Sequence, residues 1–318
     1  GQIYAFTVFA DEIAVVCNKI SEKSTVQFAF SLGIFFLGMG AAFFGKIVEK
    51  NIKLSTAIGT ILFVSGLTIT SWGIKTGSLS AIYVGYGLFT GIGTGIIYIT
   101  PVKTMMLWFD NHKALAAAVP IISFGLGSSV CTLLYKGFTL GTDGGIFLLR
   151  YCGLQTLGAS KAFLVLAVIY AIPMTAASLL IRKPVRTQTT FAENVPALRF
   201  SYLKLISDTK FLRMWLFMFL NISCGLFLIP LAQQLMDLKE VGYSKSFSTA
   251  VLTVMGLMNG AGRFIFAWWS DRLTRRINRL LIILAISFGV MLSSLLPILL
   301  AAAFVVISAC YGAGFSTI

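Results

Sequence analysis

Gly38-Met39-Gly40-Ala41 is followed by Gly45 and Glu49-Lys50, and this pattern nearly recurs 222 residues later (260 − 38). The second copy reads Gly260-Ala261-Gly262-Arg263, followed by Ala267 and Asp271-Arg272. Each copy lies at the end of an apolar run of helix length and continues into a basic loop. The repeat predicts a duplicated architecture. Arg263, which replaces Ala41 of the first copy, marks a position where the two copies differ.

The composition predicts a chain that spans a membrane many times. Of its 318 residues, 57% are hydrophobic and only 11% are charged, and the mean hydropathy is +0.89. Soluble domains are about 25% charged, and a helix needs about 20 apolar residues to cross the hydrocarbon layer. We expect ten apolar segments, at residues 1–17, 25–46, 54–74, 79–102, 114–135, 160–181, 212–236, 246–269, 278–297 and 299–318.

A polar stretch at 182–211 is predicted to link an N-terminal transmembrane half, 1–181, to a C-terminal half, 212–318. Sixteen of the 25 lysines and arginines fall in loops on the linker's side and eight on the other side, so we expect the linker to be cytoplasmic. The repeat offset implies six helices per half. On that interpretation the chain is a piece cut at both ends, whose first segment is incomplete and whose last two helices lie beyond residue 318.

Several classes of function are excluded by the pattern of residues. The sequence pI is about 9.7, but the positive charges lie in short loops rather than on one face, which excludes a nucleic-acid partner. The five cysteines form no CxxC pair and the lone His112 lies in a charged loop, so no metal or cofactor is expected. No Walker A sequence or catalytic triad spacing is present, which predicts neither ATP-driven transport nor an enzyme.

The glycines Gly87, Gly91, Gly93 and Gly95 superficially suggest a nucleotide-binding loop. They lie within an apolar helical segment and follow no strand. Since three of them recur every four residues, they predict close packing against a neighbouring helix.

The loop signatures resemble those of the major facilitator superfamily: Gly45-x-x-x-Glu49-Lys50-x-x-Lys53 and Ala267-x-x-x-Asp271-Arg272-x-x-Arg275-Arg276. Within that superfamily the chain resembles the oxalate/formate antiporter family over essentially its whole length. The stretches that carry this resemblance are 1–9, Tyr98-Ile99-Thr100-Pro101-Val102, Trp108-Phe109-Asp110, 123–128 and Asn259-Gly260-Ala261-Gly262-Arg263.

The resemblance implies an all-α membrane protein of two six-helix halves that transports by alternating access. The sequence departs from the family pattern at Ile52, where the loop signature usually has glycine, and at Ala267, which replaces the glycine seen at Gly45. The family pattern also includes an anion-binding lysine in the eleventh helix, a segment that these 318 residues do not include.

Arg263 is the strongest candidate for a substrate-binding residue. It lies eight residues before Asp271, which is about 12 Å along a helix and therefore deep in the bilayer. An arginine there costs at least about 2.5–3.5 kcal/mol, and its guanidinium matches the geometry of a carboxylate. By resemblance, the family's substrate-binding arginine in the eighth helix falls on this position. The alternative is a structural arginine that pairs with an acid or backbone carbonyls, or extends outward.

Aromatic residues are expected to wall such a site, because small anions with an apolar part suit a cage with few polar groups. The candidates lie in segments one, four and ten, which line the central cavity in the superfamily: Tyr4, Tyr98, Tyr311 and Phe315. Each could instead face lipid or pack between helices.

The loop signatures are predicted to help gate the inner mouth by clamping neighbouring helices. Their residues are Gly45, Glu49 and Lys50 in the first copy and Asp271, Arg272, Arg275 and Arg276 in the second. The alternative is that these charges serve membrane topology alone.

These observations predict a monomeric carrier of small organic anions in the inner (cytoplasmic) membrane. No acidic residue is found near the midplane of the expected segments, so an exchanger of oxalate/formate type is favoured over proton coupling. Two alternatives stay open. One is a proton-coupled monocarboxylate carrier, or another superfamily member that uses Arg263 for a different anion. The other is a substrate-sensing receptor on a transporter scaffold.

Overall fold

A computed structural model describes residues 6–18, 23–109, 116–123, 126–127, 130, 158–184, 207–236, 245–270, 286 and 300–315. These residues form helices and short connections, with no strand in the described ranges. The helices are η1 (Phe6–Phe9), α2 (Ala10–Val16), α3 (Lys23–Lys50), α4 (Ile52–Thr76), α5 (Leu79–Ile82), η3 (Tyr83–Thr90), α6 (Gly91–Trp108), α9 (Gly158–Leu180), α11 (Thr209–Met236), α12 (Lys245–Ser270) and α14 (Leu300–Phe315). The predicted all-α class is confirmed.

Four of the described helical stretches are long and apolar enough to cross a membrane: Ser24–Lys50, Ile52–Thr76, Leu79–Trp108 and Gly158–Leu180. Shorter apolar stretches occupy Ala250–Ile265 and Leu300–Ala313. The expected segment at 278–297 lies outside the described residues, apart from residue 286, which is helical.

The helix boundaries follow from local capping. The side chain of Asn51 accepts a hydrogen bond from the N–H of Leu54 at 3.1 Å and so starts α4. That helix ends at Gly77, whose φ of 68° is the left-handed conformation that glycine adopts without a Cβ clash. Asp208 accepts from the N–H of Lys210 at 2.9 Å, which starts α11 before the apolar run expected from residue 212.

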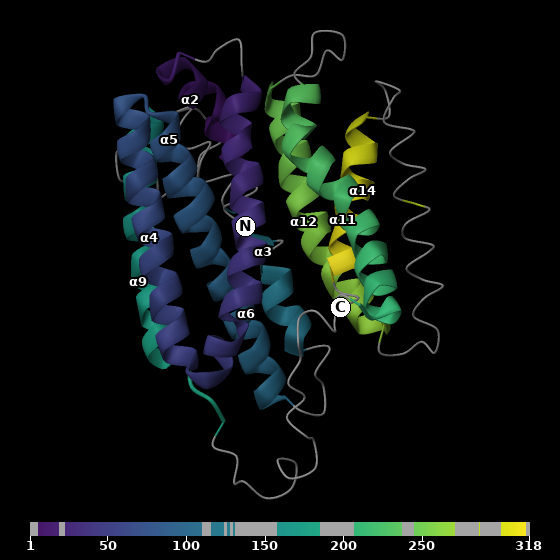
Figure 1. Cartoon of the computed structure of the whole chain (residues 1–318). Coiled ribbons are helices and arrows are strands. Elements are labelled where there is room, and N and C mark those ends of the chain that lie inside the picture. The colour runs from purple at the N-terminus through teal and green to yellow at the C-terminus, as the bar shows by residue number, and fades with distance from the viewer. Residues whose placement is uncertain are drawn as a thin grey trace, which may run out of the picture.

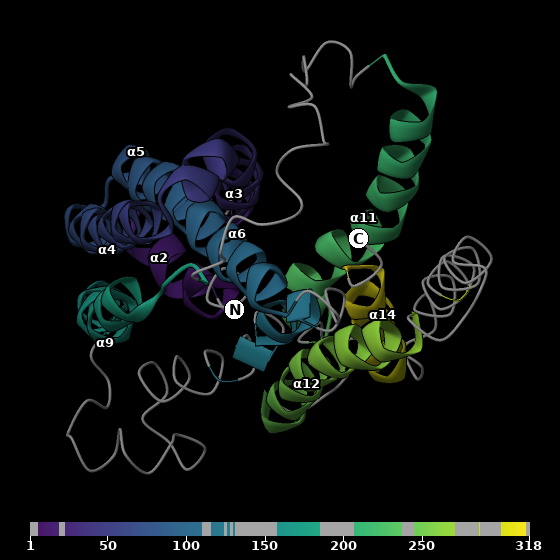
Figure 2. The same ribbon diagram turned by 90° about the horizontal axis from the view of Figure 1, so that it is seen from below.

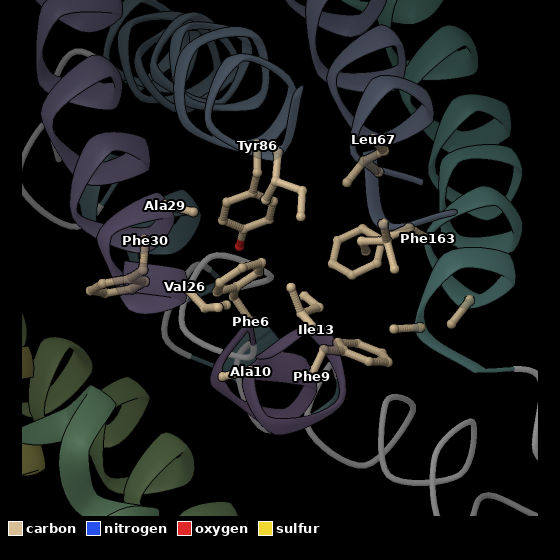
Figure 3. Packing of buried hydrophobic residues seen from close by; sticks show 14 of the residues in the cluster. Phe6, Phe9, Ala10, Ile13, Val26, Ala29, Phe30, Leu67, Tyr86 and Phe163 are labelled. Atoms are coloured by element: carbon tan, nitrogen blue, oxygen red, sulfur yellow. The ribbon is translucent and has the colours of Figure 1, made fainter. Parts of the chain in front are cut away.

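The described helices form two packed groups (Figures 1 and 2). The first group contains the helices from η1 to α9, and the second contains α11, α12 and α14. A buried aromatic cluster fills the centre of the first group, where Phe6 stacks on Tyr86 with a ring-centroid distance of 4.2 Å and both approach Phe163 (Figure 3). A separate cluster around Met236, Met255 and Phe304 fills the second group.

The glycines of the fourth segment allow it to lie directly against α3, as their spacing predicted. A Cβ on Gly87, Gly91 or Gly95 would come within 3 Å of an atom of α3, so side chains there are excluded, whereas a Cβ on Gly93 would meet α4. The contacts are Gly87 with Leu32, Gly91 with Gly33 and Phe36, and Gly95 with Leu37 and Ala41. Small residues of this kind are how helices approach closely in a bilayer.

The same segment includes the π-helix η3, whose wider turn is fixed by an i to i+5 contact. The hydroxyl of Thr90 donates to the carbonyl of Gly85 at 3.0 Å. On the neighbouring helix, Gly66 lies against Gly85 and Thr90, again with no room for a side chain. The π-turn therefore lies in a glycine-mediated contact between α4 and the fourth segment.

Candidate functional site

Arg263 is completely buried in α12, with 0% of its surface exposed. Its Nε donates to Oδ1 of Asn259 at 2.9 Å, and its Nη1 donates to the backbone carbonyl of Ile121 at 3.0 Å. Asn259 is one helical turn earlier on α12 and only 2% exposed. Ile121 belongs to the fifth segment, in the helical residues 116–123. These bonds connect the arginine both to its own helix and to the first half of the chain.

The orientation of the Asn259 amide follows from this geometry. The guanidinium is only a donor, so the amide must turn its oxygen toward Nε and its NH₂ group away. The two side chains are four residues apart and share one face of α12. Asn259 thus fixes the arginine from one side through a bond that does not depend on the neighbouring helices.

The backbone of α12 is held tightly against α14 at the same level. A Cβ on Gly262 would collide with the carbonyl of Ala309, and one on Gly312 would collide with the carbonyl of Asn259. Only glycine fits at either position, because these obstacles are backbone atoms that cannot rotate away. Arg263 and Asn259 therefore lie on α12 at the level where it packs tightly against α14.

Tyr311 is the predicted aromatic residue that lies beside this contact between α12 and α14. It precedes Gly312 on α14, is 1% exposed and packs its ring against Gly225 of α11. It also belongs to the buried cluster that contains Phe6 and Tyr86, so it joins the second helix group to the first. Tyr311 is therefore buried where the two groups meet.

The structure describes only some of the other aromatic candidates. Tyr98 lies on α6 and is partly buried. Tyr4 lies outside the described residues, as does the side chain of Phe315, the last residue of α14.

The first loop signature joins the ends of two helices. Glu49, near the end of α3, forms an ion pair with Lys103 of α6, with Oε1 and Nζ 2.5 Å apart. Lys103 also donates to the carbonyl of Gly45 at 3.3 Å. The Lys103 side chain is 29% exposed and that of Glu49 is 66% exposed, so solvent screens the pair considerably.

Residues after α9 join the same cluster. Lys183 donates to the carbonyls of Glu49 and Lys50, which lie at the end of α3 where helix carbonyls have no partner within the helix. Trp108 at the end of α6 donates its indole N–H to the carbonyl of Arg182 at 3.0 Å. The ends of α3, α6 and α9 are thus held together.

The second loop signature, Asp271, Arg272, Arg275 and Arg276, lies outside the described residues. Within the described residues, no group of three or more histidine, cysteine and acidic side chains lies close enough to hold a metal ion.

Sequence reasoning missed the partners of these groups. Asn259 could have been found, since it is a polar residue four positions before Arg263 in an apolar helix. The carbonyl of Ile121 could not, because any residue supplies the same backbone acceptor. Lys103 lies just after the expected apolar segment 79–102 and two residues after Pro101, but α6 continues through it to Trp108.

Comparison with known proteins supports the architecture. Residues 6–318 match the sequence model of the Major Facilitator Superfamily. An uncharacterised MFS-type transporter of Escherichia coli, YhjX, is 22% identical over 282 residues, covering 86% of this chain and 63% of that protein. The probable transporter MCH2 of Saccharomyces cerevisiae is 28% identical over 119 residues, covering 36% of this chain and 23% of that protein. The chain therefore spans less than two thirds of these relatives.

Solved structures of other transporters share the fold. The E. coli fucose:proton symporter FucP aligns over 99% of this chain and 86% of its own, with 16% identity and a TM-score of 0.53. The E. coli xylose transporter XylE in its inward-open conformation aligns over 99% of this chain and 79% of its own, with 12% identity and a TM-score of 0.55.

The family match covers nearly the whole chain, and the helices have the length and apolar character that a membrane carrier needs. The match is to a family of membrane transporters. The chain belongs to the major facilitator superfamily.

Proposed function

We propose that this chain forms part of a carrier of small carboxylate anions, which exchanges them across the membrane by alternating access between the halves 1–181 and 212–318. The observation that carries the proposal is the complete burial of Arg263 inside an apolar helix. A charge costs several kcal/mol at such a place, and residues of this kind in membrane segments usually lie on substrate pathways.

The chemistry of the arginine favours a carboxylate. A guanidinium presents a planar fork of N–H donors, and a carboxylate can accept two of them side by side. Two of its partners, the Asn259 amide and the Ile121 carbonyl, are neutral groups that orient the guanidinium. An anion that approaches Arg263 meets a cation whose orientation is already fixed.

The other expected site residues have supporting roles in this proposal. Tyr311, with Tyr4, Tyr98 and Phe315, would wall the anion's apolar part. The charges at Asp271, Arg272, Arg275 and Arg276 would help gate the inner mouth, together with the cluster of Gly45, Glu49 and Lys50. We place the monomeric carrier in the inner membrane with 182–211 in the cytoplasm, which the distribution of basic residues supports.

The test uses the full-length protein in liposomes loaded with unlabelled oxalate, formate or lactate and given the labelled anion outside. We expect label to accumulate with wild type, and Arg263→Ala to abolish that accumulation because it removes both the charge and the fork. Arg213→Ala, which removes an exposed arginine of α11, is the matched control and should exchange like wild type.

The same assay separates the alternatives. Accumulation that survives Arg263→Ala would refute the role of this arginine. Uptake that a protonophore abolishes would favour a proton-coupled monocarboxylate carrier over an exchanger. Binding of a carboxylate without any transport would favour a substrate-sensing receptor.

A further inference from the structure

The bonds from Arg263 to Asn259 and to Ile121 differ in what happens to them when the helix groups move. The bond to Asn259 lies within α12 and moves with that helix. The bond to Ile121 joins residues 142 positions apart and connects α12 to the fifth segment, on the other side of the linker. Relative motion of the two halves at this level must break the second bond, whereas the first can persist.

The contact between α12 and the fifth segment is close at the same level. A Cβ on Gly260 would lie 2.7 Å from Cδ2 of Leu126 and 2.8 Å from its Cγ. Gly260 is next to Asn259, and Leu126 is little more than one helical turn beyond Ile121. Because Gly260 has no side chain, the two segments approach closely enough for the arginine to reach the Ile121 carbonyl.

We propose that the Ile121 carbonyl is an internal competitor of the substrate for Arg263. In the empty carrier the Arg263–Ile121 bond holds α12 against the fifth segment, and a bound carboxylate displaces that carbonyl and frees the two halves to move. The inference rests on the proposed role of Arg263 as the anion anchor. Its consequence is that the empty carrier reorients slowly while the loaded carrier reorients fast, which is the property that makes a carrier an exchanger.

The strengths of the two acceptors support this displacement. A carboxylate carries a full negative charge, and its hydrogen bonds to a guanidinium are roughly twice as strong as those of a neutral carbonyl. Asn259 keeps Nε occupied throughout, so the guanidinium does not lose its orientation when the acceptor at Nη1 changes. The Arg263–Ile121 bond therefore persists while the site is empty and breaks when an anion binds.

The experiment loosens the contact without changing Arg263. Gly260→Val pushes α12 away from Leu126, and Leu126→Ala in the same protein restores the space. Gly38→Val is the matched control, because it places the same side chain on a membrane helix where nothing lies within 4 Å of a Cβ. Liposomes are loaded with labelled oxalate, formate or lactate, and efflux is measured with and without the unlabelled anion outside.

For wild type we expect fast efflux in exchange and slow net efflux. Gly260→Val should raise the ratio of net efflux to exchange by about tenfold, since a hydrogen bond to a charged group contributes at least that factor to an equilibrium. The double variant with Leu126→Ala should return the ratio toward that of wild type, and Gly38→Val should leave it unchanged. A ratio that is the same in Gly260→Val and Gly38→Val would overturn the inference.

A second measurement needs no transport. Spin labels are attached at Lys53 of α4 and Lys210 of α11, both exposed and in opposite helix groups, in protein whose five native cysteines are replaced. The empty protein should show one narrow distance distribution, and Gly260→Val should broaden it. If no anion is exchanged, the proposed function fails while this measurement still decides whether the contact holds the halves together; an unbroadened distribution would refute it.

Discussion

The ion pair between Glu49 and Lys103 permits a quantitative test of how the ends of α3 and α6 are held together. Three variants are compared with wild type: Glu49→Gln, Lys103→Met and the double variant. Glu49→Gln keeps the shape of the side chain and removes its charge, and Lys103→Met keeps most of the apolar stem. The double-mutant cycle then isolates the energy of the pair itself.

The magnitude follows from the geometry and the exposure. The charged atoms are 2.5 Å apart, but the two side chains are 29% and 66% exposed, so solvent reduces the attraction to the range of surface pairs. We expect a coupling free energy of about 0.5–1 kcal/mol. Lys103→Met should cost more than Glu49→Gln, because it also removes the bond to the Gly45 carbonyl at 3.3 Å.

The assay is thermal unfolding of purified protein in detergent, repeated at low and high salt. Each single variant should lower the midpoint by about 1–4 °C, and the coupling should shrink in 1 M salt, where the Debye length is about 3 Å. Reversing the pair with Glu49→Lys and Lys103→Glu should recover only part of the loss, because a carboxylate at 103 cannot donate to Gly45. Strictly additive single variants, or a coupling insensitive to salt, would refute the reasoning.

Three further changes have defined outcomes. Ser71→Ala should lower the unfolding midpoint more than substitution of an exposed serine does. Ser71 and Ser160 each donate a hydroxyl hydrogen bond to the other's backbone carbonyl, at 2.6 and 2.9 Å, and such bonds contribute about 0.6 kcal/mol each in a membrane. Glu12→Ala should cost about 1 kcal/mol and Glu12→Gln less, measured by the same unfolding, since its carboxylate accepts from the first turn of α9 at 2.5 Å. Gly262→Ala should reduce the yield of folded protein in size-exclusion chromatography, whereas Gly38→Ala should not. Only Gly262→Ala places a Cβ against backbone atoms. Equal yields of the two variants would contradict the tight packing of α12.

Local chemistry made much of the fold predictable. The apolar runs of membrane-spanning length and the glycine spacing of the fourth segment are properties of neighbouring residues, so they could be predicted without any knowledge of the partner helices. The same is true of Arg263 as a candidate, because the cost of a charge deep in the bilayer depends on its position along one helix. The family match and the described helices agree with the predicted membrane-spanning runs.

The partners of these residues required the tertiary structure. Arg263 reaches a backbone carbonyl 142 positions away and Glu49 pairs with a lysine 54 positions away; neither separation leaves a periodic signal in the sequence. The register of these contacts is set by packing, since Gly260 and Gly262 determine how closely α12 approaches its two neighbours. The sequence by itself determined which helices form and where a buried charge lies, and only the packing of those helices decided which groups that charge meets.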